Sequence, residues 1–477
     1  MNHRLRAVHR ARIGVSPSRR TIAVIGAGAS GTLAAVHLLR LPGAGVRVVL
    51  IDRTAHGPGV AYATDDPRHR LNVRASGMSA FDDDPDDLLR WCRVRGIDAA
   101  PDDFLPRALF GEYLRSLLKR FGDADRLELI TGTVAGIEPA VDRDALRVEL
   151  ADGRSLVADV GVLALGNAAP APLPGIEPSE AYVANPWTHN ALDRAVGARK
   201  IIIVGSGLTA VDIALSVSAI NPETEVCAVS RHGWLPRMHM RQRTRARAIQ
   251  LPPNGRGGLV ALVDAIAESV SADPSQWRDV IDGLRPHTDE LWQQLSLDDR
   301  RLFLRELKSW WDVHRHRMAP AVGDELERLQ RAGRLTVMAG AFHGACVTGT
   351  EVLAEVRTRS LTRRLHGDLL INATGPSSPV GGSADQLTRR LLARGDAQPD
   401  ALGLGFACDA DGRLLSDGGA CADRLFTLGP PRRGELFESF AIPEIRAQAE
   451  ALSRVLRSCP LGDRGSAQPL AAAAGSR

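Results

Sequence analysis

The fold of this 477-residue chain is decided by Thr21-Ile22-Ala23-Val24-Ile25-Gly26-Ala27-Gly28-Ala29-Ser30-Gly31. A β-branched run leads directly into Gly-x-Gly-x-x-Gly, and the apolar stretch 32–41 that follows has the composition of a helix. This order predicts a strand, a tight turn and a helix. The first glycine permits the turn, the second lets a pyrophosphate approach the backbone, and the third allows close helix packing. The pyrophosphate is expected at the helix N-terminus, because free N–H groups and the helix dipole favour negative charge there.

A second predicted strand, 46–51, ends in Asp52, which lies 21 residues beyond Gly31 (52 − 31 = 21). At this place a carboxylate accepts hydrogen bonds from the adenosine ribose hydroxyls. The residues predicted to bind a dinucleotide at this first motif are Gly26, Gly28, Ser30, Gly31, Asp52 and the adjacent Arg53.

The same design recurs 179 residues later (205 − 26 = 179). A strand at 200–204 leads into Gly205-Ser206-Gly207-Leu208-Thr209-Ala210, and a helical stretch at 211–218 leads into a strand at 226–229. The internal spacing is identical, since 52 + 179 = 231 places Arg231 at the position of Asp52. Two such units predict an α/β protein with two Rossmann-like dinucleotide-binding domains.

The second motif differs from the first in its third glycine, replaced by Ala210, and in its acidic strand end, replaced by Ser230-Arg231. A carboxylate there repels a 2′-phosphate, whereas a guanidinium beside a hydroxyl binds one. The alternative is that Arg231 ends its strand in solvent. The further arginines between Arg237 and Arg247 fit an anion site or a solvated loop equally well. The second site is therefore expected to prefer NADPH over NADH, through Gly205, Gly207, Leu208, Thr209, Ala210, Ser230 and Arg231.

Two more buried-strand runs, 160–166 and 368–375, stop at Gly166 and Gly375, where a backbone can pass close to a ligand or a neighbouring domain. Because they enclose the second motif, we expect the second domain to be inserted in the first. Helical patterns at 258–271, 277–295 and 298–318 predict a helical insertion that either covers the second domain or walls a substrate pocket. The predicted boundaries are 1–20 (disordered, basic), 21–180 (first domain), 181–365 (second domain, with the insertion at about 258–332), 366–460 (first domain again) and 461–477 (disordered tail).

Composition excludes several other classes of protein. A net charge of +4 and 44% hydrophobic residues indicate a soluble globular protein and give no case for nucleic-acid binding. Six scattered cysteines with no Cys-x-x-Cys pair exclude a zinc ribbon and a dithiol centre, and no metal site is predicted. The basic N-terminus lacks the apolar stretch of a signal peptide, and no apolar run is long enough to span a membrane, so we expect a cytoplasmic protein.

The ordered pattern of the two glycine motifs, Asp52, 163–166 and 373–375 resembles the two-dinucleotide-binding-domain flavoproteins, which bind FAD at the first motif and NAD(P)H at the second. The resemblance to a bacterial family of FAD/NAD(P)-binding proteins extends over about 21–456, and flavin-dependent monooxygenases that oxidise amines are related more distantly. The resemblance implies FAD and NADPH as cofactors. It also places Asn72 in a loop that approaches the flavin, although a polar turn residue is an equally good interpretation. The segments that carry it are 59–62, 71–73, 185–187, 207–212, 230–237 and 433–446.

The chain departs from the pattern of these flavoproteins at its C-terminal strand. Such proteins usually carry a Gly-Asp pair there whose carboxylate binds the flavin ribityl chain, but here Gly429 is followed by Pro430 and Pro431. That contact is replaced or absent. The fingerprint of Baeyer–Villiger monooxygenases is missing as well, so that chemistry is not expected. No catalytic side chain is predicted, because the flavin itself accepts hydride and activates oxygen.

Together these patterns predict an FAD-dependent, NADPH-using oxidoreductase. Family resemblance favours a monooxygenase that acts on a small molecule with oxygen, and the more distant relatives extend this to N-oxidation. Two alternatives remain open. One is a flavin reductase that passes electrons to a partner protein, and the other is a non-catalytic nucleotide-binding or redox-sensing protein in which the altered Gly429-Pro430 end weakens flavin retention.

Overall fold

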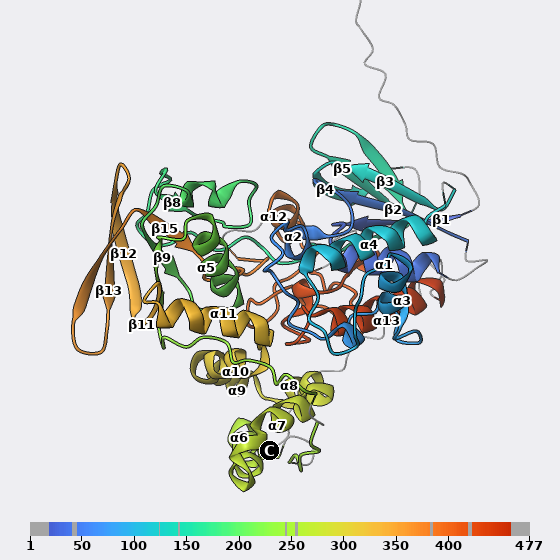
Figure 1. The fold of residues 1–477 in the computed structure, drawn as a ribbon. Helices are drawn as coiled ribbons and strands as arrows, with labels where there is room; N and C mark the ends of the chain where they lie inside the picture. Colours follow the sequence, from blue (N-terminus) through green and yellow to red (C-terminus); the bar gives the residue numbers. More distant parts are fainter. Residues whose placement is uncertain are drawn as a thin grey trace, which may run out of the picture.

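Two parallel five-stranded sheets organise the chain, with a lobe of helices below them in Figure 1. The predicted disordered tail 461–477 and the predicted basic N-terminus 1–20, apart from Arg19 and Arg20, lie outside the described residues. Within the described part, no helix is long and apolar enough to cross a membrane. The computed structural model describes residues 19–40, 45–123, 125–141, 144–243, 246–252, 256–381, 385–417 and 422–458.

The first sheet has the strand order β16-β7-β1-β2-β3, with every neighbouring pair parallel. The inner part of its central strand, 22–25, is apolar because both faces are covered. Ile22 and Val24 join a core formed with helices, whereas Ala23 and Ile25 join a core formed with a three-stranded antiparallel sheet, β4-β5-β6. The strands are β1 (Arg20–Ile25), β2 (Val46–Asp52), β3 (Leu127–Thr131), β4 (Val134–Pro139), β5 (Leu146–Leu150), β6 (Ser155–Ala158), β7 (Val160–Leu163) and β16 (Leu425–Thr427).

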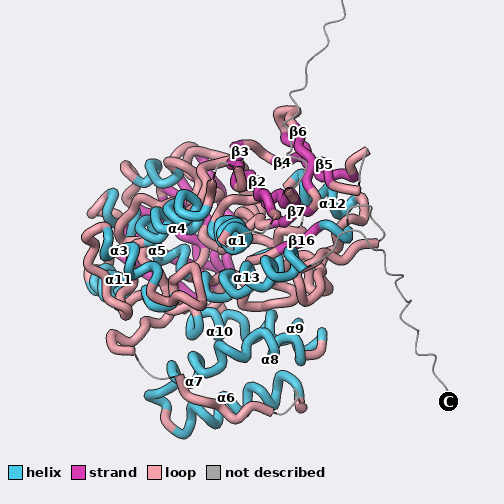
Figure 2. Tube along the Cα trace, turned by 90° about the vertical axis from the view of Figure 1, so that its right-hand side faces the viewer, coloured by secondary structure: helices cyan, strands magenta, loops and turns pink. Residues whose placement is uncertain are grey.

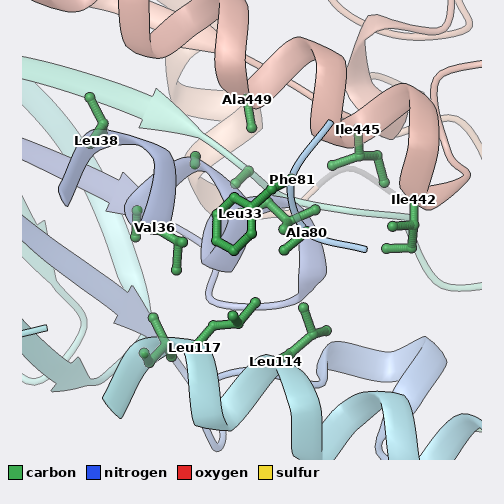
Figure 3. Packing of buried hydrophobic residues seen from close by; sticks show 14 of the residues in the cluster. Leu33, Val36, Leu38, Ala80, Phe81, Leu114, Leu117, Ile442, Ile445 and Ala449 are labelled. Carbon is green, nitrogen blue, oxygen red and sulfur yellow. The ribbon is translucent and has the colours of Figure 1, made fainter. Parts of the chain in front are cut away.

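Helix α1 (Ala29–Leu39), which follows the first glycine motif, is buried between two other helices. Figure 3 shows its Leu33 and Val36 between side chains of α4 (Arg107–Phe121) and of α13 (Ile442–Ser458). The C-terminal helix therefore completes the core around the first motif, although more than 400 residues separate it from α1 in the chain.

The second sheet repeats the design of the first. Its order is β11-β10-β9-β15-β8, so β9, β10, β11 and β15 correspond to β1, β2, β3 and β7. As in the first domain, the chain forms a three-stranded antiparallel sheet, β12-β13-β14, after the third strand (β11) and before the strand that returns to the sheet (β15). The internal repeat therefore extends from the motif to the whole domain. The elements are β8 (Tyr182–Val183), β9 (Lys200–Val204), α5 (Leu208–Ile220), β10 (Glu225–Ser230), α11 (Pro320–Arg331), β11 (Leu335–Ala339), β12 (Ala341–Thr348), β13 (Glu351–Arg357), β14 (Thr362–Gly367) and β15 (Leu369–Asn372).

The second domain is inserted in the first, as the sequence predicted. Strand β16 pairs with β7, matching Leu425 to Gly161, and the second sheet lies entirely between them in the chain. The predicted boundary at 366 is wrong, because β15 pairs with β9 and belongs to the second sheet. After β15 the chain returns to the first domain through α12 (Gln386–Ala393), whose Leu387 and Leu391 pack into the first-sheet core.

The predicted helical insertion forms a separate lobe, visible at the bottom of Figures 1 and 2. Ser296 caps α9 as expected, because its Oγ accepts a hydrogen bond from Asp299 N at 3.1 Å. The predicted end of the insertion at 332 is wrong, since Val322, Leu326 and Leu329 of α11 pack in the core of the second domain. The helical lobe is α6 (Gly258–Ala272), α7 (Trp277–Leu284), α8 (Thr288–Gln294), α9 (Leu297–Leu302), a π-helical turn (Phe303–Leu307) and α10 (Lys308–Arg315).

Candidate cofactor-binding site

The first glycine motif is held together by close backbone contacts. Gly26 has φ +100°, and a Cβ on it would collide with the carbonyl oxygen of Ala164, at the end of β7. A Cβ on Gly31 would collide with the carbonyl oxygen of Gly26. Both positions therefore require glycine for the turn and for helix packing. A Cβ on Gly28 would lie 3.3 Å from the Cα of Gly59, at the start of the short helix α2 (Gly59–Tyr62), so the second glycine also admits this loop.

The N-terminus of α1 fits a pyrophosphate. Gly28 is its N-cap residue, and among the described residues no side chain caps the helix, so the N–H groups of the first turn are left for an anion. Asp52 lies beside this turn, because its Oδ2 accepts a hydrogen bond from Ala27 N at 2.7 Å while its Oδ1 accepts one from Thr54 N at 2.8 Å. Thr54 Oγ1 also donates to Oδ1 at 2.9 Å. A carboxylate has about four acceptor positions, which leaves room for a ribose hydroxyl. Arg53 is exposed at the same strand end.

The unusual Gly429-Pro430 end lies against this first motif. Gly429 has φ +75°, and a Cβ on it would be 2.5 Å from Ser30 Oγ. Its N–H donates to Gln448 Oε1 of α13 at 2.8 Å. A backbone turn, followed by Pro430 and Pro431, thus lies beside the first turn of α1. In related flavoproteins a carboxylate was expected at this place.

The second motif repeats these contacts in a more open form. Gly205 has φ +120°, and a Cβ on it would collide with the carbonyl oxygen of Ala373, at the end of β15. Gly207 is the N-cap residue of α5, and a Cβ on it would meet nothing within 4 Å among the residues described. Ala210, which is buried, occupies the place of Gly31. Leu208 and Thr209 are half-buried in the first turn of the helix.

The end of β10 lies beside the turn of the second motif. Ser206 Oγ lies 2.7 Å from Ser230 Oγ, and Gly233 N donates to Ser230 Oγ at 3.1 Å. Arg231 is exposed, and its Nη2 lies 3.5 Å from Ser309 Oγ on α10. This guanidinium is therefore accessible at the strand end and borders the helical lobe.

Gly166 and Gly375 do not themselves make the close backbone approaches that were expected at their strand ends. Both have positive φ, +67° and +87°, but a Cβ on either would meet nothing within 4 Å in the described chain. The close approaches at these strand ends are made instead by the preceding carbonyls of Ala164 and Ala373. Just beyond, the two segments that connect the domains lie side by side, because Ser377 Oγ donates to Ala169 O at 2.7 Å.

Asn72 lies where the two domains meet. Its backbone carbonyl accepts a hydrogen bond from His239 Nε2, 3.0 Å away in the segment that leaves β10. Burial, together with the positive charge of Arg317, lowers the pKa of His239 to about 3, so its ring is neutral at pH 7. The neighbouring Arg74 donates to Met240 O at 2.7 Å. The Asn72 loop thus contacts the second domain through the backbone carbonyl of Asn72 and the side chain of Arg74.

Sequence reasoning missed a buried polar cluster between the domains. Arg107 Nη2, at the start of α4, lies 2.7 Å from Asp212 Oδ2 on α5, and the Asp212 side chain is 5% exposed. Burial raises the pKa of Asp212, and the charge of Arg107 opposes this rise. Beside this pair, His69 Nε2 lies 2.9 Å from Ser216 Oγ, which donates to Asp66 Oδ2 at 2.6 Å. The signal in the sequence was a carboxylate within an otherwise apolar helix, Ala210 to Leu215.

The helical lobe packs against the segment 433–444 of the first domain, which follows the Gly429 turn. Trp311 Nε1 donates to Glu438 Oε1 at 2.8 Å, and Arg285 Nε donates to Glu444 Oε1 at 2.9 Å. Burial alone would raise the pKa of Glu438, but His316 and Arg315 hold it well below its usual range. The lobe thus covers the first domain rather than the second sheet alone.

Residues 23–168 match the family model described as FAD-NAD(P)-binding. Solved structures extend the likeness to both domains. The ornithine N-hydroxylase of Kutzneria sp. 744, in a structure with reduced FAD, NADP+ and L-ornithine, is 18% identical with a TM-score of 0.61, covering 92% of this chain and 99% of that one. The chain has the fold of the two-dinucleotide-binding-domain flavoproteins.

Two further solved structures share this flavoprotein fold. The FAD-bound cadaverine monooxygenase of the Erwinia amylovora desferrioxamine pathway is 14% identical with a TM-score of 0.63, covering 95% of this chain and 99% of that one. The bacillithiol disulfide reductase of Bacillus cereus is 14% identical with a TM-score of 0.53, covering 92% and 99%. No curated protein matches the chain in sequence. The expected architecture, with two nucleotide-binding domains of which one is inserted, is confirmed.

The glycine contacts predict a difference between the two motifs. Gly31→Ala should lower the free energy of unfolding by about 1–3 kcal/mol, because the added methyl group overpacks the turn. Gly207→Ala is the matched control and should change it by less than about 1 kcal/mol, because its surroundings are open. Urea denaturation of both variants measures the difference. Equal stability of Gly31→Ala and the unsubstituted protein would contradict the packing described.

The Arg107–Asp212 pair generates a second stability prediction. Asp212→Asn should destabilise the protein by about 3–5 kcal/mol, because it leaves a largely buried guanidinium, 15% exposed, without its counter-charge. Glu325→Gln breaks an exposed ion pair with Arg328 and should cost below about 1 kcal/mol. Denaturant unfolding followed by tryptophan fluorescence measures both. A loss no larger for Asp212→Asn than for Glu325→Gln would show that the buried pair does not stabilise the domain contact.

Proposed function

We propose that this chain is an FAD-dependent, NADPH-using oxidoreductase that binds FAD at the first motif and NADPH at the second. The observation that carries the proposal is the presence of two helix N-termini, at Gly28 and Gly207, that lack side-chain caps in the described chain and stand at the carboxyl ends of two parallel sheets. Ligands of such folds bind at that edge. One chain with two such sites fits an electron transfer between two dinucleotides.

At the first site the chain offers the residues that FAD requires. The first turn of α1 donates N–H groups to the pyrophosphate, and Asp52 accepts from the ribose. Ser30 and Gly429 flank the same turn, and the Asn72 loop extends from the first domain toward the second. We assign Gly166 to the strand end that borders this site.

At the second site α5 holds the pyrophosphate of NADPH, and Arg231 with Ser230 takes its 2′-phosphate. Gly205 and Gly375 shape the strand ends around it. The Arg107–Asp212 pair ties α5 to the first domain, so the same helix that receives NADPH is fixed relative to the FAD site. Hydride transfer needs such fixed geometry, because small displacements between reacting atoms cost large factors in rate.

Oxygen chemistry on a small molecule is the activity that the arrangement supports best. When bound, reduced FAD supplies the electrons that activate oxygen. The helical lobe covers the segment 433–444 and shields this part of the first domain from solvent, as a protected oxygenation site requires. The chain has no Cys-x-x-Cys pair to receive electrons, which disfavours a disulfide reductase. The likeness to ornithine and cadaverine monooxygenases supports N-oxidation of an amine.

Oxygenation predicts coupled turnover. With NADPH and oxygen, at least one amine from a panel that includes ornithine, lysine and cadaverine should accelerate NADPH oxidation and give a hydroxylamine product in proportion to the NADPH consumed. Product analysis by mass spectrometry and a peroxide assay measure the coupling. Stoichiometric peroxide release with every amine, without an oxygenated product, would contradict the monooxygenase assignment and leave the reductase.

The coenzyme assignment predicts a selective loss at Arg231. Arg231→Ala should raise the KM for NADPH in flavin reduction by about 10–100-fold, because a charge-assisted phosphate contact contributes about 1.5–3 kcal/mol. The KM for NADH should change less than about threefold. Arg331→Ala, which removes a 77% exposed charge on α11, is the matched control and should change neither value. An unchanged NADPH preference in Arg231→Ala would exclude this residue from phosphate recognition.

A further inference from the structure

A partly open cavity of about 360 Å³ is formed by α6, α7 and α10 of the helical lobe together with Arg237. These three helices are visible in Figure 2. The cavity is separate from both glycine motifs, and the proposed function does not use it. Its lining residues are Arg237, Val270, Pro274, Trp277, Arg278, Ile281, Trp310 and His314.

The charge of this cavity favours an anion. Two lining residues are arginines, and none of the lining residues is acidic. Arg278 Nε donates to Met238 O at 3.0 Å. Burial lowers the pKa of Arg278, the nearby charge of Arg237 lowers it further, and the carboxylates of Asp282 and Asp279 oppose this change. Arg237 has an exposed side chain. A group with two negative charges would be attracted by these two guanidinium groups.

The remaining walls favour a planar ring. Trp310 stacks on His314 with ring centroids 4.2 Å apart, and Trp277 meets His314 edge-on at 4.9 Å. Trp310 is 39% exposed, which is unusual for a large apolar side chain beside a cavity. Burial lowers the pKa of His314, so the ring stays neutral at pH 7. Aromatic faces beside arginines suit a ligand that carries both a flat ring and an anionic group.

The position of the cavity connects it to the coenzyme site. Arg237 lies six residues beyond Arg231 (237 − 231 = 6), and its N–H donates to Val313 O of α10 at 2.8 Å. Ser309, next to Trp310 on the same helix, is the residue that Arg231 approaches. Helix α10 therefore contacts the strand end that was predicted to recognise a 2′-phosphate and also lines the cavity.

We propose that this cavity binds the 2′-phosphorylated adenosine end of NADPH. The inference rests on the proposed function and extends it, because it makes the helical lobe a determinant of coenzyme choice in addition to a cover for the first domain. Arg237 and Arg278 hold the 2′-phosphate together with Arg231, which approaches Ser309 next to Trp310. Trp310 provides the face for the adenine ring.

The test uses the FAD-loaded protein and two probes, adenosine 2′,5′-bisphosphate and adenosine 5′-phosphate, titrated by calorimetry and by quenching of tryptophan fluorescence. The unsubstituted protein should bind the bisphosphate at least about 10-fold more tightly, because the second phosphate reaches the arginines. Trp310→Ala and Arg278→Ala should each weaken bisphosphate binding by about 10-fold or more. Arg301→Ala removes a 54% exposed charge on α9, away from the cavity, and should bind like the unsubstituted protein.

The outcomes separate this inference from the proposed function. Normal bisphosphate binding by the protein and by both cavity variants, each shown to be folded by circular dichroism, would overturn the inference and leave NADPH use intact. An unsubstituted protein that does not distinguish the two probes would overturn the 2′-phosphate assignment itself. Weakened binding in both variants but not in Arg301→Ala would support the cavity as the adenosine site.

Discussion

The architecture depends on one backbone contact that occurs twice. In each domain the returning strand, β7 or β15, ends with its carbonyl oxygen against the first glycine of a motif, Gly26 or Gly205. No side chain fits between them, so the turn from strand to helix can form only with glycine and a positive φ. This contact places the N-termini of α1 and α5 at the carboxyl edges of their sheets. Everything proposed about cofactors follows from those two helix ends.

Because the same contact forms in both domains, the second domain can be inserted in the first without changing either nucleotide site. The two connecting segments run side by side, joined at Ser377 and Ala169, and would allow relative movement of the domains. The Arg107–Asp212 pair and the contact between Asn72 and His239 restrict that movement. The helical lobe contacts the first domain through Glu438 and Glu444. The domain junction is therefore the place where both proposed cofactors and a substrate can meet.

Much of this could be predicted from the sequence, because local rules dictate it. The strand, turn and helix around each motif follow from β-branched runs and glycine spacing, and the capping by Ser296 follows from a side-chain rule. The ends of the inserted domain and of the lobe were predicted wrongly. The sequence patterns of the strand at 369–372 and of the helix at 320–331 would be the same in either domain. Only the pairing of the strand with β9 and the packing of the helix on α5 assign them to the second domain. The Arg107–Asp212 pair joins residues distant in the sequence, so no local pattern reveals the partner of Asp212.

The visible absorption spectrum of the purified protein, repeated without oxygen after addition of NADPH, tests whether both nucleotide sites bind their cofactors. The spectrum should show the bands of oxidised flavin, and these should bleach when NADPH is added, because both sites are then occupied and electrons pass from NADPH to FAD. This outcome would support the two proposed sites. A colourless protein that cannot be reconstituted with FAD would contradict them, as would a bound flavin that stays oxidised in the presence of NADPH.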